Sequence, residues 1–436
     1  MSIGTMKVRP ILSLFFIFYI LQTASGQDAR ARFVGLDKLL GEESFFDNHL
    51  SGFMLYDLDS QMILYEKNSQ LNFIPASTIK LFTFYASIMV LDDSTNVLRF
   101  VPRGKDVQIW GTGDPSWKYN SLPQPRLKDF FAAYDKIYFS VSNWNDDAFG
   151  YGWQWDDYFH AYSAEKSPFP IFGNLVTAVN VNNKPRISPL YFRDSISPST
   201  RVMRTVVRDF HSNRFFYNPR TYNGRKKEVP FITSPKIFAE LASKELSKEV
   251  LLSTDILPPE HFVLKGTATV PLYREMLRES DNFIAEQLLL MISDEVYKEM
   301  NTGKAIDYVL KNFLNDLPDD PQWVDGSGLS RHNLVSPRTM IALAEKIYRL
   351  FPDDLLFDLL ATGGRTGTLE RNYLAPVPYV FAKSGTLSNN HSLVGFLKTK
   401  RNKLYAFAFM NNNYLYKASE VRREMEKVFL YIRDNY

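Results

Sequence analysis

The feature that most constrains the fold is a change of character in the middle of the chain. Between about Asp93 and Lys265, proline, glycine, asparagine and aromatic residues are frequent, and apolar runs are short. Such segments favour short strands joined by turns. Apolar residues at helical spacing dominate on both sides of this stretch. The chain therefore predicts a first domain built from two separate segments, interrupted by an inserted β-rich domain.

The outer segments contain helical and strand-like patterns in alternation. Strand-like runs around short polar turns predict one hairpin at 52–65 and another at 392–410. Helical patterns are predicted at 72–89, 271–279, 283–297, 303–314, 336–350 and 419–434, and in the middle stretch only at 234–246. The last helix is expected to pack on the adjacent hairpin rather than on a membrane surface. These elements predict a mixed α/β (α+β) fold.

Composition removes several classes of function. Apolar residues make up 45% of the 436 positions and charged residues 23%, which is ordinary for a globular protein. The net charge of +3 gives no electrostatic support to nucleic-acid binding. Without cysteine there is no disulfide, thiolate nucleophile, iron–sulfur cluster or lipoprotein anchor. The six histidines have no metal-binding spacing, so no metal or cofactor is expected.

The first 26 residues have the pattern of a secretory signal peptide. Lys7 and Arg9 precede an apolar run from Ile11 to Leu21, and small residues at 24–26 follow it. The apolar run is shorter than the ~20 residues that a spanning helix needs. We therefore expect cleavage near Gly26, export, and no spanning segment in the mature protein.

A serine and a lysine three residues apart begin the predicted helix at 72–89. Ser77 and Lys80 would share one face of that helix, where a lysine with a lowered pKa could activate the serine hydroxyl. Backbone N–H groups at the helix start could bind an oxyanion. The pattern alone is common, and Ser163 and Lys166 also match it, in poor helical context before a proline.

Two further short patterns carry hydroxyl, amide and amine groups. Ser280 and Asn282 lie between two predicted helices, where Ser280-Asp281-Asn282 could instead be a helix cap. The run from Lys383 to Thr386 follows a strand-like segment, and its Gly385 is expected to let a ligand backbone approach closely. Ser388 to Asn390 matches the Ser-x-Asn pattern by chance.

Together and in this order, the three patterns are those of β-lactamases and penicillin-binding proteins. The sequence resembles the penicillin-recognising D-Ala-D-Ala peptidases, and more closely the carboxypeptidase/endopeptidase family of the penicillin-binding protein 4 type. The narrower match uses segments 152–157, 280–286, 325–330 and 333–337. Ser77 and Ser280 also lie 203 positions apart, which leaves room for that family's inserted domain.

The resemblance implies a β-lactamase/transpeptidase-like domain, with an antiparallel sheet flanked by helices. Its segments would be 27–95 and 265–436, and the inserted domain would be 96–264. It also implies that Ser77 attacks the carbonyl of a D-Ala-D-Ala bond and that Lys80 accepts the serine proton. Ser280 would relay a proton to the leaving amine, beside an electropositive Lys383.

The resemblance also implies a set of substrate-binding groups. Asn282 would bind the substrate amide, and Ser384 and Thr386 its terminal carboxylate. The N–H groups of Ser77 and Thr386 would form the oxyanion hole. Asp156 and Arg371 would bind the free end of the stem-peptide side chain, although each could equally be an ordinary surface charge. Two departures are Ser384, where the family usually has threonine, and an insert that looks short.

The implied protein is a periplasmic, penicillin-sensitive carboxypeptidase that acts through an acyl-serine, with endopeptidase action on peptidoglycan crosslinks. Its partners would be peptidoglycan stem peptides, with β-lactam antibiotics as covalent inhibitors. Two alternatives stay open. One is a β-lactamase or esterase of the same superfamily, against which the long insert argues. The other is a non-catalytic muropeptide-binding protein, which would not need a nucleophile beside a base.

Overall fold

The computed structural model describes residues 24–119, 122–181, 184–202, 205–222 and 224–436, with side chains from residue 32 onward. Residues 24–26 of the predicted leader begin helix α1 (Ala24–Leu40), which the sequence patterns did not predict. The rest of the leader lies outside the described residues, so its cleavage stays a prediction. None of the described helices combines the length and apolar character needed to cross a membrane.

A six-stranded antiparallel sheet organises the two outer segments. Its strand order is β14-β15-β16-β17-β1-β2, so the N-terminal hairpin joins four C-terminal strands through the β1–β17 pair. Both predicted hairpins are confirmed. The strands are β1 (Leu50–Asp57), β2 (Met62–Lys67), β14 (Ala361–Thr362), β15 (Val380–Leu387), β16 (Asn390–Lys398) and β17 (Leu404–Asn412).

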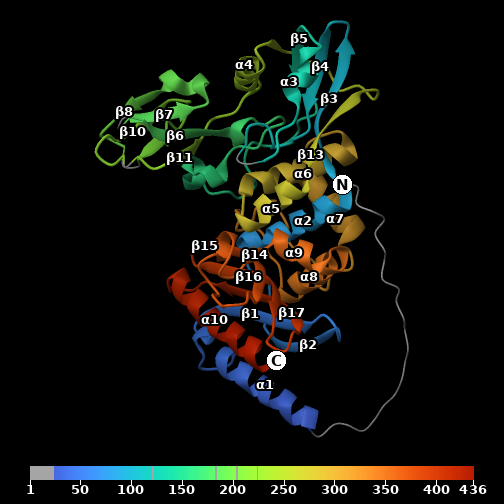
Figure 1. Ribbon diagram of the computed structural model, residues 1–436, viewed down its shortest axis with the longest axis vertical. Helices are drawn as coiled ribbons and strands as arrows, with labels where there is room; N and C mark the ends of the chain where they lie inside the picture. Colours follow the sequence, from blue (N-terminus) through green and yellow to red (C-terminus); the bar gives the residue numbers. More distant parts are fainter. Residues whose placement is uncertain (1–23, 120–121, 182–183, 203–204, 223) are drawn as a thin grey trace.

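Helices cover both faces of this sheet (Figure 1). On one face lie α1 and α10 (Ala418–Asn435), side by side, and the apolar residues of α10 are buried as predicted. A second core on the other face holds the predicted helices and the unpredicted α9. These are α2 (Lys80–Val90), α5 (Val270–Arg278), α6 (Asn282–Tyr297), α7 (Thr302–Phe313), α8 (Pro337–Leu350) and α9 (Asp353–Leu359). The predicted fold class is confirmed.

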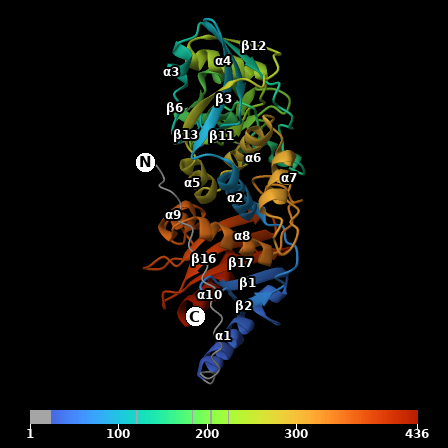
Figure 2. The ribbon, with the colours of Figure 1, turned by 90° about the vertical axis from the view of Figure 1, so that its right-hand side faces the viewer.

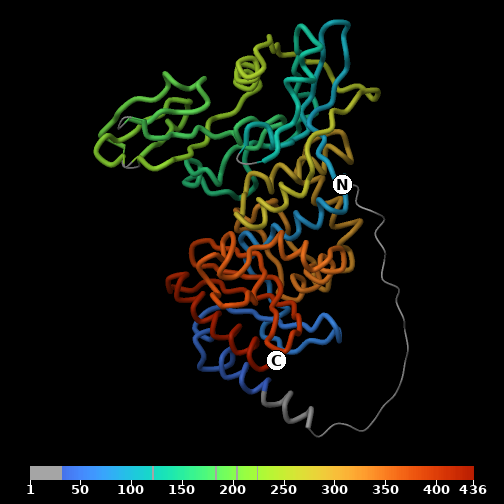
Figure 3. Tube along the Cα trace, viewed as in Figure 1, coloured from blue at the N-terminus to red at the C-terminus, as the bar shows by residue number. Residues whose placement is uncertain are grey.

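The middle of the chain builds three smaller sheets beyond the helical layer (Figures 2 and 3). The largest has the order β12-β5-β4-β3-β13, and the others are β11-β6-β7 and β8-β10-β9. Their strands are β3 (Ser94–Arg103), β4 (Asp106–Gly111), β5 (Lys136–Ser140), β6 (Leu175–Val181), β7 (Lys184–Ser188), β8 (Ile196–Pro198), β9 (Val206–Arg208), β10 (Phe215–Tyr217), β11 (Lys227–Pro230), β12 (Glu249–Leu252) and β13 (Phe262–Ala268).

Two α-helices accompany these strands. The predicted α4 (Pro235–Leu246) is capped by Ser234, whose side chain accepts from the Ile237 N–H, while the short α3 (Leu127–Ala132) was not predicted. Single-turn 3₁₀ helices complete the chain: η1 (Phe45–Asp47), η2 (Ala76–Ile79), η3 (Trp155–Phe159), η4 (Ala161–Ser163), η5 (Phe172–Asn174), η6 (Leu190–Ser195) and η7 (Gly367–Leu369).

A buried ion pair joins the middle segment to α6. Arg99 of β3 and Asp294 of α6 have side chains only 2% and 1% exposed, and Arg99 Nη2 lies 2.7 Å from Asp294 Oδ2. Arg99 Nε adds contacts of 3.1 Å to both carboxylate oxygens. Burial raises the pKa of Asp294, and the Arg99 charge opposes that rise. The carboxylate therefore depends on Arg99 for its charged form.

Replacing Arg99 with methionine should lower the free energy of unfolding by about 3 kcal/mol, because an unpaired carboxylate would remain buried. Urea denaturation measures the loss. Lys265→Met is the matched control, because it breaks an ion pair between two exposed side chains. Lys265 is 50% exposed and Asp92 is 74% exposed. That variant should change stability by less than about 1 kcal/mol. Equal effects of both variants would contradict the prediction.

Candidate active site

Ser77 lies in η2, the turn that leads directly into α2. Ala76 in this turn has a φ of 49°, a left-handed conformation that is uncommon for a residue other than glycine. Such strain is found most often at functional sites. The turn leaves Ser77 half-buried, while Lys80, one turn further, is fully buried at the start of α2.

Among the residues that the structure describes, the amine of Lys80 contacts three oxygens and no carboxylate. Its Nζ lies 2.9 Å from Ser77 Oγ, 2.6 Å from Asn282 Oδ1 and 2.6 Å from the Ser327 carbonyl oxygen. The last two oxygens can only accept, whereas the serine hydroxyl can also donate. A neutral amine can therefore donate to both acceptors and keep its lone pair for the Ser77 proton. After transfer, the ammonium donates to the same three oxygens without any rearrangement.

Burial lowers the pKa of Lys80 to about 8, against the opposing charges of Asp325, Glu286 and Asp281. A lysine becomes a base near neutral pH when desolvation outweighs such charges. Ser77 and Lys80 therefore lie in hydrogen-bond contact, with the lowered lysine pKa that a nucleophile–base pair requires.

Two buried carboxylates hold the loop that supplies the Ser327 carbonyl. Glu286 accepts from the N–H groups of Ser327 at 2.8 Å and Gly326 at 3.2 Å. Asp325 accepts from the Gly328 N–H and from the Trp153 indole N–H. Burial and the nearby Asp325 charge raise the pKa of Glu286 to about 7. Together these contacts fix one of the two acceptors of the Lys80 amine.

The Ser280–Asn282 segment forms the turn between α5 and α6, as predicted. Ser280 has a φ of 64°, so the chain reverses there in a left-handed conformation. Asp281 caps α6 by accepting from the Ile284 N–H at 2.9 Å. Asp281 is therefore the helix cap. The side chain of Asn282 is left to contact Lys80, and that of Ser280 to contact Lys383.

The middle segment contacts this turn twice. Tyr119 donates its hydroxyl to Asp281 Oδ2 at 2.6 Å, and Asn282 Nδ2 donates to the Tyr162 carbonyl at 3.0 Å. Asn282 thus holds the Lys80 amine with its oxygen and the middle segment with its nitrogen. The segment between β3 and β13 therefore contributes to one wall of the site.

Lys383 of β15 completes the cluster from the side of the sheet. Its buried amine donates to Ser280 Oγ at 2.8 Å and to the Ser384 carbonyl at 2.8 Å. Burial lowers the pKa of Lys383 well below its ordinary value, and the positive charge of Lys80 lowers it further. Ser77, Lys80 and Asn282 therefore form one hydrogen-bonded set, and Ser280 and Lys383 form a second, which the turn at 280–282 brings beside the first.

Gly385 lies close to another part of the chain's own backbone. A Cβ at this position would lie 2.5 Å from the Pro75 carbonyl oxygen and 2.8 Å from the Ser77 nitrogen. The close neighbour of Gly385 is therefore the η2 turn, and the close approach of a ligand backbone stays a prediction. The contact sets the spacing between β15 and the Ser77 N–H.

Gly385→Ala should slow acylation of Ser77 by about 10²-fold, because a shift of about 1 Å at a reacting group can cost that much. Stopped-flow acylation by a fluorescent penicillin gives the rate. Gly303→Ala is the control, since a Cβ there meets only Asn301 Oδ1 at 3.4 Å. Comparable rates in Gly385→Ala and Gly303→Ala would contradict the role given to the close approach.

The two hydroxyls of the third motif have separate partners. Ser384 Oγ donates to Thr368 Oγ1 at 2.7 Å, which places η7 beside the strand. Thr386 is exposed, and its Oγ1 lies 2.8 Å from Nδ1 of the buried His391. Both hydroxyls lie on β15, next to the cluster formed by Lys383.

The structure does not bring every predicted residue into the cluster. Asp156 in η3 and Arg371 after η7 are exposed, and within the described ranges neither has a hydrogen bond or ion pair to the cluster. The second Ser-x-x-Lys match is structural, since the buried Lys166 lies 3.1 Å from Asp146 Oδ2 and 3.1 Å from Thr302 Oγ1. The chance Ser-x-Asn match, 388–390, spans the turn between β15 and β16.

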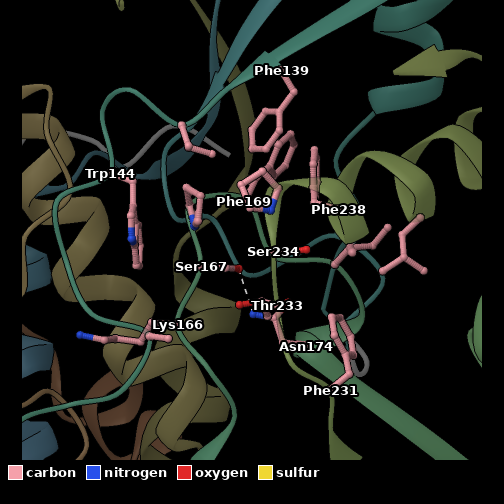
Figure 4. Close-up of a pocket in the computed structure, with 16 residues that line it drawn as sticks. Phe139, Trp144, Lys166, Ser167, Phe169, Asn174, Phe231, Thr233, Ser234 and Phe238 are labelled. Atoms are coloured by element: carbon pink, nitrogen blue, oxygen red, sulfur yellow. Dashed lines mark hydrogen bonds between the residues drawn. The ribbon is translucent and has the colours of Figure 1, made fainter. Parts of the chain in front are cut away.

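An apolar cavity of about 240 Å³ lies elsewhere, in the middle segment (Figure 4). Aromatic rings of Phe139, Phe169 and Phe238 gather on one side, and the Lys166 amine points away from them. None of the predicted site residues lines it. The serine and lysine pair that the sequence predicted lies in the polar cluster around Ser77, not in this cavity.

Some residues of the site were missed because their roles depend on distant contacts. Glu286 lies one turn after Asn282 on the same helix, which is a signal that could have marked its carboxylate. Tyr119, Tyr162 and Thr368 have no such signal, because each reaches the site only through the tertiary fold.

Comparison with known proteins agrees with this geometry. The model of the D-Ala-D-Ala carboxypeptidase 3 (S13) family matches residues 35–207 and 236–433. D-alanyl-D-alanine carboxypeptidase DacB of Haemophilus influenzae is 25% identical over 412 residues, which span 83% of this chain and 85% of that protein.

Solved structures show the same fold. Penicillin-binding protein 4 (DacB) of Haemophilus influenzae superposes with a TM-score of 0.69 at 22% identity, over 91% of this chain and 97% of that one. Its complex with a β-lactam superposes with a TM-score of 0.70 at 20% identity, over 92% and 99%. Because the family model accounts for most of the chain, on both sides of the gap at 208–235, the chain belongs to the D-Ala-D-Ala carboxypeptidase 3 (S13) family.

Proposed function

We propose that this protein is an exported serine D-Ala-D-Ala carboxypeptidase that acts on peptidoglycan stem peptides through an acyl-serine. The observation that carries the proposal is the buried Lys80 amine, 2.9 Å from Ser77 Oγ and with a pKa lowered to about 8. Family membership supports the substrate class. Endopeptidase action on crosslinks would use the same site, because a crosslink also presents an amide that follows a D-alanine.

The reaction begins at Ser77. Its Oγ attacks the carbonyl carbon of the penultimate D-alanine as its proton passes to Lys80 Nζ. The resulting oxyanion lies between the N–H groups of Ser77 and Thr386, each worth about 3 kcal/mol in comparable acyl-transfer sites. The C–N bond then breaks, and the leaving amine takes a proton through the Ser280 hydroxyl, which Lys383 contacts. Water hydrolyses the ester and restores Ser77.

Substrate binding uses the neighbouring polar groups. Asn282 hydrogen-bonds the amide of the peptide, and the hydroxyls of Ser384 and Thr386 bind the terminal carboxylate. Asp156 and Arg371 lie on exposed surfaces. In this proposal, a substrate that reaches both surfaces is bound there by the charged end of its stem-peptide side chain. The site belongs to a domain of residues 27–95 and 265–436, and residues 96–264 form the inserted domain. Removal of the leader near Gly26 places the protein in the periplasm.

Release of D-alanine from a pentapeptide ending in D-Ala-D-Ala tests the carboxypeptidase directly. The control peptide ends in D-Ala-L-Ala, which has the same composition and charge. We expect release from the first peptide only, and a crosslinked muropeptide dimer measures endopeptidase action in parallel. No release from any of these substrates by a folded protein would overturn the proposal.

Two reagents separate the alternatives. Covalent labelling by fluorescent penicillin is expected of the carboxypeptidase and of a β-lactamase, but not of a binding protein. Repeated turnover of nitrocefin is expected of the β-lactamase alone, because it requires fast hydrolysis of the acyl-enzyme. We expect stable labelling with little turnover.

The rate of acylation should rise with pH. Only the neutral Lys80 amine can accept the Ser77 proton, and its lowered pKa of about 8 leaves roughly a tenth of it neutral at pH 7. The rate constant should therefore increase about tenfold per pH unit below that value and level off above it. A pH series of penicillin acylation rates measures the curve, and a flat profile from pH 6 to 9 would contradict the assignment.

A further inference from the structure

His391 is a buried histidine to which the proposed mechanism gives no role. It lies on β16 directly opposite Thr386 of β15, and the imidazole is only 2% exposed. Its Nδ1 lies 2.8 Å from Thr386 Oγ1. The histidine therefore stands immediately behind a hydroxyl that the proposed function assigns to the substrate carboxylate.

The single hydrogen of the threonine hydroxyl can serve one acceptor at a time. If Thr386 donates it to an unprotonated Nδ1, nothing remains to donate to the substrate. If Nδ1 carries a hydrogen and donates to Thr386 Oγ1, the hydroxyl hydrogen is free to point outward. The tautomer of His391 thus decides whether Thr386 can donate to a carboxylate.

The other ring nitrogen distinguishes these cases. His391 Nε2 is buried and has no hydrogen-bond partner in the part of the chain that the structure describes. A buried N–H without an acceptor is costly, whereas an unprotonated nitrogen there leaves only a lone pair unused. The neutral imidazole therefore carries its hydrogen on Nδ1.

The surroundings also hold the ring neutral. Burial lowers the pKa of His391 to about 3, and the charge of Arg422 on α10 lowers it as well. A hydrogen bond from the ring to the Gly385 backbone opposes this shift, and because Nε2 has no partner among the described residues, that bond also uses the Nδ1 hydrogen. Behind it, Asn411 Nδ2 contacts the His391 carbonyl at 3.4 Å, and Asn411 Oδ1 lies 3.0 Å from His49 Nε2.

We propose that His391 is a positioning residue: its Nδ1–H donates to Thr386 Oγ1 and so directs the Thr386 hydroxyl hydrogen to the terminal carboxylate of the substrate. This inference rests on the proposed function, from which it takes the carboxylate. His391 would then help to select substrates that end in a free carboxylate. It does so from β16, the strand next to the one that carries Ser384 and Thr386.

Steady-state kinetics with two variants test the role. Leucine has a similar shape but no donor, whereas the asparagine amide can place an N–H where Nδ1 lies. His391→Leu should raise KM for the D-Ala-D-Ala peptide about tenfold, with kcat within about twofold of wild type. His391→Asn should stay within about threefold in KM. Equal losses in both variants, or a KM unchanged in His391→Leu, would overturn the proposal.

The opposite tautomer predicts the opposite change in KM for His391→Leu. If Thr386 donated to His391, removing that acceptor would free the hydroxyl and lower KM. A double variant tests the path of the effect: in a Thr386→Val background, His391→Leu should cause no further change in KM. A further rise there would show that His391 acts on folding or on another group.

The tautomer can also be read without any enzymatic activity. Long-range ¹H–¹⁵N spectra of the protein labelled at histidine nitrogen distinguish Nδ1–H from Nε2–H, and His391→Asn identifies the signal among the six histidines. We expect Nδ1–H, and an Nε2–H signal would overturn the proposal. If wild type releases no D-alanine and takes no penicillin, the proposed function fails, whatever tautomer the spectra report.

Discussion

The Ser77→Ala protein should take up no covalent penicillin and should lose peptidase activity by a factor on the order of 10⁴ or more. Ser77 Oγ is the hydroxyl that Lys80 Nζ contacts, at 2.9 Å, and the alanine variant has no atom that can form the ester. Intact-protein mass spectrometry after incubation with benzylpenicillin measures the label, and D-alanine release measures the activity.

Ser163→Ala is the matched control for this result. Ser163 begins the second Ser-x-x-Lys pattern, and Lys166 of that pattern forms an ion pair with Asp146. Labelling should be unchanged in this variant. If Ser163→Ala lost the label while Ser77→Ala kept it, the nucleophile would lie in the middle segment, and the mechanism proposed for Ser77 would be wrong.

Lys80→Met should reduce the rate of acylation by about 10³- to 10⁴-fold, at the upper end of the range for a general base. Methionine fills a similar volume but cannot take the Ser77 proton. The same substitution leaves Asn282 Oδ1 and the Ser327 carbonyl without their shared donor. Stopped-flow acylation measures the rate, and a thermal melt shows whether the variant is folded.

Lys80→Arg separates the base from the charge. An arginine keeps a positive charge in the site but stays protonated at every accessible pH, so it cannot act as a base. It should be as slow as Lys80→Met, and the rise in rate near pH 8 should disappear in both. Activity within tenfold of wild type in Lys80→Arg would mean that the cation alone suffices and that another group takes the proton.

The sequence allowed the residues of the polar cluster to be predicted because their spacing is local. Ser77 and Lys80 are one helical turn apart, and Ser280 and Asn282 share one turn between two helices with clear periodicity. The amphipathic pattern of α10 also predicted its buried face, since Val428 and Phe429 pack under the sheet. Such features depend on neighbours within a few residues.

The rest depends on contacts between distant parts of the chain. Glu286 could not be assigned to the Ser327 loop before the fold placed positions 41 residues apart in contact. Thr368 reaches Ser384 only because η7 folds back along β15. The unpredicted α1 overlaps the end of the predicted leader, where an apolar run followed by small residues favoured a targeting signal over a helix.

The helix α6 has a consequence for any attempt to make a smaller enzyme. Its first turn holds Asn282 at the site, and its last turn holds Asp294 against Arg99 of the middle segment. Asp281 and Asn282 are also contacted by Tyr119 and Tyr162. A shortened chain that joined residue 95 directly to residue 265 would expose one end of α6 and remove partners from the other. Deletion of the middle segment would therefore need compensating changes in α6 itself.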